Sequence, residues 1–334
     1  MRVLITCGDP NGIGLELLLR AMSEGALDQF DAELILCAPP TVIAAYIAAL
    51  GDDVIACVEG KRLIVGTRVM TIGTCGDVVY SPQFGIPTPE SGAVARAALE
   101  YAARSMLTGE CDAIVTLPVS KEALQMAGFP FPGQTEFFGS VAGVETTMIL
   151  ACDLLRVALV TIHVPIARVA AKVTVEREIA TLERFARALR EDWLILSPRI
   201  AVLGLNPHAG EHGTIGTEDE RVLRPAVEQL YARGLDVRGP YPADGFFARE
   251  HWRSFDGVVA QYHDQGLIPV KMLAGGRGVN ISAGLPIVRT SPDHGTAYDI
   301  VGTGRGDYRS VVAAIEMALY LARNRKQSTQ HVSL

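Results

Sequence analysis

Three histidines share a sequence context that could support chemistry. His163, His208 and His263 each follow an apolar, strand-like run directly. Side chains at the carboxyl ends of buried parallel strands point into the crevice where open α/β sheets bind ligands. Neutral imidazole is the commonest nitrogen ligand of zinc and similar ions, and three protein ligands plus an open position form the catalytic arrangement. A single loop histidine is more often just hydrogen-bonded, so spacing alone leaves open whether the three rings meet.

The stretch over residues 256–271 carries the densest polar chemistry. We expect a buried, valine-rich strand over residues 257–262, ending in a polar turn with His263, Asp264 and Gln265. An imidazole, a carboxylate and an amide placed side by side at a buried edge cost stability unless they have partners. We therefore expect an anion or a metal ion above this strand.

A second set of polar residues lies in the strand-rich segment that follows. Lys271, Asn280 and Arg289 could hold a carboxylate or a phosphate through charge-assisted hydrogen bonds. The alternative is a set of surface polar groups beside apolar strands. That alternative weighs most for Asn280 and least for Arg289, which lies between an apolar run and a turn.

The amino-terminal turn and a later helix start are further candidates for ligand binding. The turn over residues 8–14, Gly-Asp-Pro-Asn-Gly-Ile-Gly, separates a first strand from a helix and lets backbone N–H groups approach a ligand. Its spacing is not G-x-G-x-x-G, and a tight turn that simply needs glycine explains it equally well. Ser120 is expected to cap a helix, and Lys121 at that helix start opposes the dipole unless an anion lies nearby.

Strands that alternate with helices predict a largely parallel sheet with helices packed on it. The length of 334 residues favours two domains, and the proline-rich loop over residues 128–137 is a candidate crossing between them. Residues 240–247 are expected to form a loop that carries Asp244.

Composition indicates an ordinary soluble globular protein. A net charge of −7 argues against binding to nucleic acid or to anionic membranes. The six cysteines form no C-x-x-C pair, which favours reduced thiols. No apolar stretch approaches the ~18 residues of a spanning helix. The first apolar run is too short for a signal peptide, so we expect a cytoplasmic protein.

Five motifs lie in order along nearly the whole chain: Gly8–Gly14, Pro118–Lys121, Asn206–Glu211, Tyr262–Gly266 and Gly284–Thr296. Together they resemble the 4-hydroxythreonine-4-phosphate dehydrogenase family of vitamin B6 synthesis. The first turn and the stretch from His294 also resemble, more distantly, isopropylmalate and isocitrate dehydrogenases, in which such loops hold the nicotinamide cofactor.

The resemblance implies a two-domain α/β/α sandwich like that of isopropylmalate and isocitrate dehydrogenases, with the active site in the interdomain cleft. The expected cofactor-side domain comprises residues 1–125 and 267–334, and the expected metal and dimerisation domain comprises residues 126–266. A homodimer is implied as well.

The resemblance also implies the site residues. One divalent ion (zinc, magnesium or cobalt) is expected on His163, His208 and His263. The expected substrate-binding residues are Gln134, Thr135, Lys271, Asn280 and Arg289. NAD or NADP is expected near Gly12, Gly14, His294 and Asp299, and the sequence does not choose between the two. The candidate bases are Asp264, Asp244 and Lys121.

The implied reaction is oxidation of 4-phosphooxy-L-threonine to 2-amino-3-oxo-4-(phosphooxy)butanoate. Decarboxylation then gives 3-amino-2-oxopropyl phosphate, in pyridoxal 5'-phosphate biosynthesis. The family usually has histidine where this chain has Gln134, and an amide can donate a hydrogen bond but cannot carry a proton. A related substrate is therefore the alternative, either erythronate or threonate 4-phosphate or a dihydrodiol. A non-catalytic metal- or phosphate-binding protein is a weaker alternative, because all the candidate ligands are present.

Overall fold

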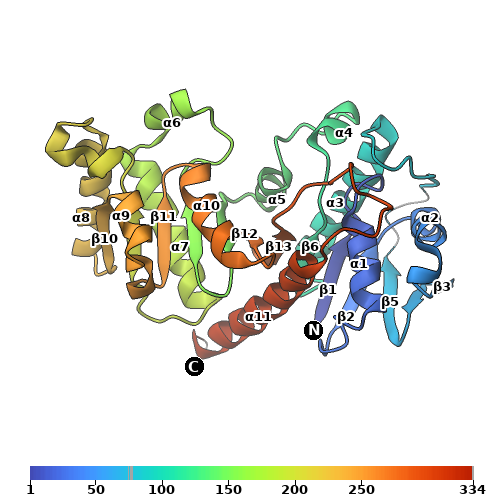
Figure 1. The fold of residues 1–334 in the computed structure, drawn as a ribbon. Coiled ribbons are helices and arrows are strands. Elements are labelled where there is room, and N and C mark those ends of the chain that lie inside the picture. Colours follow the sequence, from blue (N-terminus) through green and yellow to red (C-terminus); the bar gives the residue numbers. More distant parts are fainter. Residues whose placement is uncertain (74, 76–77, 333–334) are drawn as a thin grey trace. The chain divides into compact units, whose positions relative to one another are not determined.

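Strands and helices alternate along the chain in the computed structural model, which describes residues 1–73, 75 and 78–332 (Figure 1). The chain divides into two units. The first comprises Met1–Glu145 and Leu285–Ala322, and the second comprises Thr146–Gly284 and Arg323–Leu334. The expected boundaries were 125/126 and 266/267. Residues 126–145 lie in the first unit here, and residues 267–284 and 323–334 lie in the second.

The sheet of the first unit has the strand order β13-β6-β1-β2-β5-β4-β3. Its strands are β1 (Arg2–Thr6), β2 (Glu33–Cys37), β3 (Ala56–Glu59), β4 (Arg62–Val65), β5 (Arg68–Gly73), β6 (Ala113–Thr116) and β13 (Val288–Pro292). The pairings from β13 to β5 are parallel, and β4 and β3 add an antiparallel edge. The central strands are continuous apolar runs because both of their faces are buried.

Two helices of the first unit, α3 (Pro89–Thr108) and α4 (Lys121–Met126), start at side-chain caps. The others are α1 (Gly14–Ser23), α2 (Pro40–Leu50), α5 (Gln134–Ala142) and the beginning of α11 (Arg309–Val332), with a short turn η1 (Gly51–Asp53). Thr88 and Ser91 form a capping box at α3. Ser120 caps α4 as predicted, because its Oγ accepts a hydrogen bond from Ala123 N at 3.1 Å.

The sheet of the second unit has the order β10-β9-β11-β8-β7-β12. Its strands are β7 (Thr147–Ala151), β8 (Arg156–Leu159), β9 (Ile200–Leu203), β10 (Val237–Tyr241), β11 (Gly257–Ala260) and β12 (Val279–Ala283). The pairings among β8, β11, β9 and β10 are parallel, whereas β7 is antiparallel to both β8 and β12.

Helices α7 (Val175–Glu191) and α10 (His263–Ala274) pack on opposite faces of this second sheet, and the unit contains further helices. These are α6 (Ile166–Lys172), α8 (Arg224–Ala232) and α9 (Ala243–Ala248), with short elements η2 (Pro207–Gly213), η3 (Asp219–Leu223) and η4 (His251–Ser254). Leu267 and Val270 of α10 join the core with Val258 of β11. On the other face, a Cβ at neighbouring Gly257 would lie 2.4 Å from the Phe185 ring of α7.

Two sequence-based predictions of local structure were wrong. Residues 263–265 begin helix α10 and do not form a turn, so Lys271 lies on a helix. The polar residues there serve the helix start: Gln265 Oε1 accepts from Gln261 N at 2.7 Å, and Asp264 lies in the first turn. Residues 240–247 contain the end of β10 and most of α9, so Asp244 also lies on a helix.

All six cysteines are free thiols, and Cys57 alone among them is exposed. Within the described part of the chain, no helix has both the length and the apolar character to cross a membrane.

Candidate active site

The three histidines follow three neighbouring parallel strands of the second unit. Strand β11 lies between β8 and β9, and all three run in the same direction. His163 follows β8, His208 follows β9 and His263 follows β11. The topology thus places all three residues at one edge of the sheet, which is the edge where ligands bind in such sheets.

Two of the three imidazole rings lie together. The ring centroids of His163 and His263 are 5.7 Å apart. His208 instead lines a cavity of about 710 Å³ that also contains Asp244 and that neither of the other two histidines lines. Within the described residues, no group of three or more His, Cys, Asp or Glu side chains is arranged to hold a metal ion. The three-histidine metal site therefore stays a prediction, with two of its rings adjacent.

His208 lies on an unusual backbone turn. All five residues from position 208 to 212 have positive φ, between 42° and 77°. This conformation costs a non-glycine residue about 1–2 kcal/mol, so the surroundings must hold it in place. Buried Asp219 does so at the preceding residues, accepting from Leu205 N at 2.8 Å and Asn206 N at 3.1 Å. The turn determines where His208 lies. Residue types such as Ala209 and Glu211 do not predict such a left-handed turn.

Asp264 orients one imidazole of the pair. Its Oδ1 lies 2.7 Å from His263 Nδ1. A carboxylate that accepts from Nδ1–H leaves Nε2 with the lone pair, which is the usual arrangement behind a metal-binding histidine. Of the other candidate bases, Asp244 lines the cavity with His208, and Lys121 is exposed at the start of α4 in the first unit.

Two glutamines join the ends of the three strands. Gln265 was expected among the polar groups after the strand, and Gln261 was missed. Gln261 Nε2 donates to Leu203 O at 3.1 Å, and Gln261 O accepts from the Thr161 hydroxyl at 2.6 Å. Gln265 Nε2 donates to Gly204 O at 2.6 Å. These bonds fix the bases of the loops that carry the histidines. The signal available in the sequence was a glutamine directly after an apolar run and a second glutamine four residues later.

A buried carboxyl group lies beside this network. Glu178 of α7 is fully buried, and its Oε1 accepts from Gln261 Nε2 at 3.4 Å. Burial raises the pKa of Glu178 to about 8, and the hydrogen bond from Gln261 offsets only part of that effect. Glu178 Oε2 and Gln261 Oε1 are both buried and accept no hydrogen bond from the described residues. The raised pKa favours a proton on Glu178, which would provide a donor there.

The first unit holds a buried guanidinium at the start of a helix. Arg289 of β13 is 2% exposed, and its Nη2 donates to Gln134 Oε1 at 3.0 Å while Nη1 donates to Thr135 Oγ1 at 3.3 Å. Nη2 also donates to the Thr116 hydroxyl. Burial lowers the pKa of Arg289 to about 10, so it stays cationic at neutral pH. Gln134 and Thr135 open α5, whose cap Gly133 provides no side-chain hydrogen bond.

A guanidinium beside a helix N-terminus is suited to an anion. The structure thus brings together three of the five expected substrate-binding residues. The other two belong to the second unit, where Lys271 is exposed on α10 and Asn280 lies on β12. Asn280 Oδ1 is buried and accepts no hydrogen bond from the described residues.

The glycines of the amino-terminal turn are explained by packing inside the first unit. A Cβ on Gly12 would lie 2.9 Å from Thr296, and one on Gly14 would lie 3.1 Å from Leu117. Ile13 N, at the start of α1, donates to Thr296 O at 2.8 Å. A cofactor role for Gly12 and Gly14 stays a prediction.

The loop after β13 offers groups that fit a hydrogen-bonding ligand. His294 Nδ1 lies 2.9 Å from Gly295 O and so donates to it, which leaves Nε2 as an acceptor. That Nε2 is buried and has no hydrogen-bond partner among the described residues. Asp299 is exposed on the same loop. Such acceptors suit the hydroxyl and amide donors of a nicotinamide dinucleotide.

Known structures define the fold class. The chain superimposes on isocitrate dehydrogenase from Methylococcus capsulatus with a TM-score of 0.52 at 11% identity, covering 98% of this chain and 87% of that one. The fold is therefore that of the isocitrate dehydrogenase-like α/β enzymes, as predicted.

Sequence comparison defines the family. A family model described as pyridoxal phosphate biosynthetic protein PdxA matches residues 32–318. A 4-hydroxythreonine-4-phosphate dehydrogenase from Bacteroides thetaiotaomicron is 40% identical over 334 residues, covering 98% of this chain and 90% of the relative. The chain belongs to the PdxA family, which confirms the resemblance, and it is an oxidoreductase.

Two solved structures are also similar. The 4-hydroxythreonine-4-phosphate dehydrogenase of Klebsiella pneumoniae superimposes with a TM-score of 0.81 at 33% identity, covering 96% of this chain and 99% of that one. A terephthalate 1,2-cis-dihydrodiol dehydrogenase from Burkholderia xenovorans gives a TM-score of 0.64 at 27% identity, covering 96% and 98%.

Proposed function

We propose that this protein oxidises the secondary hydroxyl of 4-phosphooxy-L-threonine with NAD or NADP. The product, 2-amino-3-oxo-4-(phosphooxy)butanoate, is a β-keto acid and loses carbon dioxide to give 3-amino-2-oxopropyl phosphate. Family membership and the names of the relatives support this substrate. The structural observation that carries it is the buried cation of Arg289 at the start of α5.

The substrate phosphate would bind at Arg289. The guanidinium, the Thr135 hydroxyl and the first amides of α5 are all donors, and together they suit a dianion. Gln134 presents its carbonyl oxygen to Arg289, which leaves its NH₂ group as a further donor. Anchoring the phosphate holds the reacting carbon in register, which lowers the entropic part of the barrier.

We further propose that His163 and His263 provide two nitrogen ligands for one divalent ion, either zinc, magnesium or cobalt. Their adjacent rings and the Asp264 contact support this assignment. His208 lines a separate cavity, so we propose that it reaches the ion from the second copy in a homodimer. A divalent ion there would polarise the substrate hydroxyl and lower its pKa.

Proton removal is assigned to Asp244 in this proposal. Asp264 already accepts from His263 Nδ1 and therefore serves to orient that ring. Asp244 lines the same cavity as His208 and would accompany that histidine to the reaction centre. Lys121, at the start of α4, is the remaining candidate base.

A related substrate is the second candidate. Gln134 replaces the histidine usual in the family, and the similarity to a dihydrodiol dehydrogenase extends over 96% of this chain. With erythronate or threonate 4-phosphate, Arg289 would still bind the substrate phosphate. A dihydrodiol has no phosphate, so the buried charge of Arg289 would have no anionic group of the substrate to bind.

The test compares reduction of NAD and of NADP with four substrates: 4-phosphooxy-L-threonine, the same compound without phosphate, erythronate 4-phosphate and a cis-dihydrodiol. The proposal expects the highest kcat/KM for 4-phosphooxy-L-threonine. A higher value for either alternative would reassign the substrate, and a preference for the dephosphorylated compound would contradict the role given to Arg289.

A further inference from the structure

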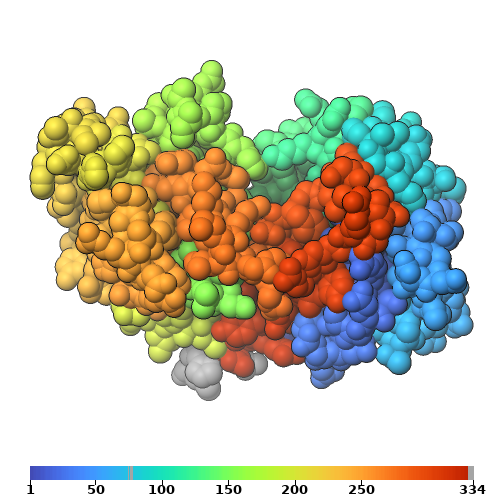
Figure 2. Space-filling view, in the orientation of Figure 1, coloured from blue at the N-terminus to red at the C-terminus, as the bar shows by residue number. Residues whose placement is uncertain are grey.

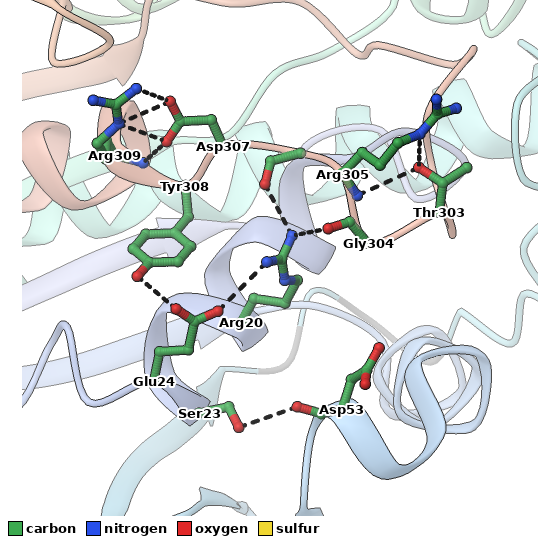
Figure 3. Close-up of polar contacts among 11 residues, drawn as sticks. Arg20, Ser23, Glu24, Asp53, Thr303, Gly304, Arg305, Asp307, Tyr308 and Arg309 are labelled. Carbon is green, nitrogen blue, oxygen red and sulfur yellow. Dashed lines mark hydrogen bonds and ion pairs between the residues drawn. The ribbon is translucent and has the colours of Figure 1, made fainter.

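The loop between β13 and α11 is held along one face of α1. Glu16, Arg20 and Glu24 are spaced four residues apart, so their side chains lie on the same side of this helix and its end. Each contacts the loop, and Figure 3 shows the Arg20 and Glu24 contacts. In Figure 2 the red-orange residues of the loop lie at the surface of the first unit, next to the blue amino-terminal residues.

The contacts follow the same order along the helix and the loop. Glu16 Oε2 accepts from Gly302 N at 2.7 Å. Arg20 Nη1 donates to Gly304 O at 2.7 Å and to Gly306 O at 2.9 Å. Glu24 Oε2 accepts from Tyr308 Oη at 2.8 Å, and its Oε1 lies 3.4 Å from Arg20 Nη2. One arginine therefore ties two loop carbonyls and joins the glutamate that holds the end of the loop.

Apart from these ties, Gly306 is buried against Ile13 and Leu17, and Thr303 Oγ1 donates to Ile300 O at 2.7 Å within the loop. The rest of this segment contributes little apolar surface. Gly302 and Gly304 have positive φ values of 75° and 68° and contribute no side chain to the core. Thr303 and Arg305 are exposed. A segment with few buried apolar contacts opens easily, so its order depends on polar ties of this kind.

The preceding part of the same loop carries the groups assigned to the cofactor. Tyr298 Oη donates to buried Asp9 Oδ2 at 2.8 Å, next to exposed Asp299. His294 lies four residues before Tyr298. Asp299 therefore lies between the tie at Asp9 and the ties at Glu16 and Arg20, whereas His294 precedes all of them.

We infer that Arg20 is a positioning residue for the nicotinamide cofactor, because it holds the loop segment that follows Asp299. The inference rests on the proposed NAD(P)-linked function but not on the identity of the substrate. A loop that is ordered before binding loses less conformational entropy when the ligand binds. Loss of Arg20 should therefore weaken cofactor binding. Arg20 itself needs no contact with the cofactor.

The experiment measures dissociation constants of NADH and NADPH by fluorescence titration, and kcat and both KM values, for the wild type and three variants. Arg20→Met removes the ties. Arg20→Lys keeps the charge but not the planar fork that reaches Glu24 and the two carbonyls. Arg309→Met is the matched control, because Arg309 pairs with Asp307 near the end of the same loop and not with α1.

For Arg20→Met we expect the preferred dinucleotide to bind about tenfold more weakly, the size of change expected when one charge-assisted hydrogen bond is lost. Substrate KM and kcat should stay close to those of the wild type, and Arg20→Lys should fall between the two. Hydrogen exchange should rise in residues 294–306 in Arg20→Met and not in Arg309→Met.

Wild-type affinity in a folded Arg20→Met or Arg20→Lys variant would overturn the inference while leaving the proposed function intact. Equal weakening in Arg309→Met would also overturn it, since the effect would then be general to the loop end. Failure of the wild type to bind either dinucleotide would instead overturn the proposed function itself.

Discussion

Replacing Glu178 with glutamine should stabilise the second unit at neutral pH and change it much less in mild acid. The carboxyl group is fully buried beside Gln261, and burial raises its pKa from 4.5 to about 8. Glutamine has the shape of the protonated acid and keeps both a donor and an acceptor. The substitution therefore removes a titration and leaves the packing nearly unchanged.

The sign follows from proton binding. Between pH 4.5 and pH 8 the folded chain keeps the Glu178 proton while the unfolded chain releases it, so folding stability falls as pH rises. The raised pKa of Glu178 lowers the free energy of unfolding of the wild type by about 3 kcal/mol at pH 7 and by about 1 kcal/mol at pH 5. The advantage of Glu178→Gln over the wild type should therefore grow by about 2 kcal/mol between these two pH values.

Urea unfolding followed by tryptophan fluorescence measures this directly. The chain has two tryptophans, and both Trp193 and Trp252 are buried in the second unit, so the signal reports the unit that contains Glu178. Glu228→Gln, an exposed carboxylate on α8, is the matched control and should show no such growth. If the difference between Glu178→Gln and the wild type is the same at pH 5 and pH 7, Glu178 is ionised in the folded protein and the reasoning is refuted.

Two further predictions concern the candidate site. Arg289→Met should raise KM for the phosphorylated substrate by roughly tenfold to a hundredfold and remove the preference for that substrate over its dephosphorylated form, because the charged donor to phosphate is lost. A preference that survives in this variant would place the phosphate elsewhere. Asp264→Ala should weaken binding of a divalent ion by about tenfold or more, since His263 loses the acceptor that orients its ring. Competition with a zinc chelator measures this, and an unchanged affinity would exclude His263 as an oriented ligand.

The apolar runs were enough to predict most of the elements. Buried strands such as β6 and β11 are continuous apolar segments, and their alternation with helices predicted the parallel sheets. The same reasoning failed at residues 263–265, because polar residues that serve a helix start look like those of a turn. Lys271 was placed among strands for the same reason.

The site was predicted less completely than the fold. Apolar runs placed each of the three histidines directly after a strand, and the strand pairing puts them at one sheet edge. The left-handed turn at residues 208–212 has no signature in residue types such as Ala209 and Glu211. The pairing of Gln134 and Thr135 with Arg289 joins positions about 155 residues apart in sequence, and it was expected only from the family resemblance. The Glu178–Gln261 contact links a helix to a strand end, and nothing local indicates it.

The most direct test of the account uses 4-phosphooxy-L-threonine labelled at the carboxyl carbon, with purified protein, a divalent ion and NAD or NADP. We predict that reduced nicotinamide and labelled carbon dioxide appear in equal final amounts, and that removing the substrate phosphate abolishes most of the rate. Absence of nicotinamide reduction with both dinucleotides, in protein shown to be folded and supplied with zinc, magnesium or cobalt, would contradict it.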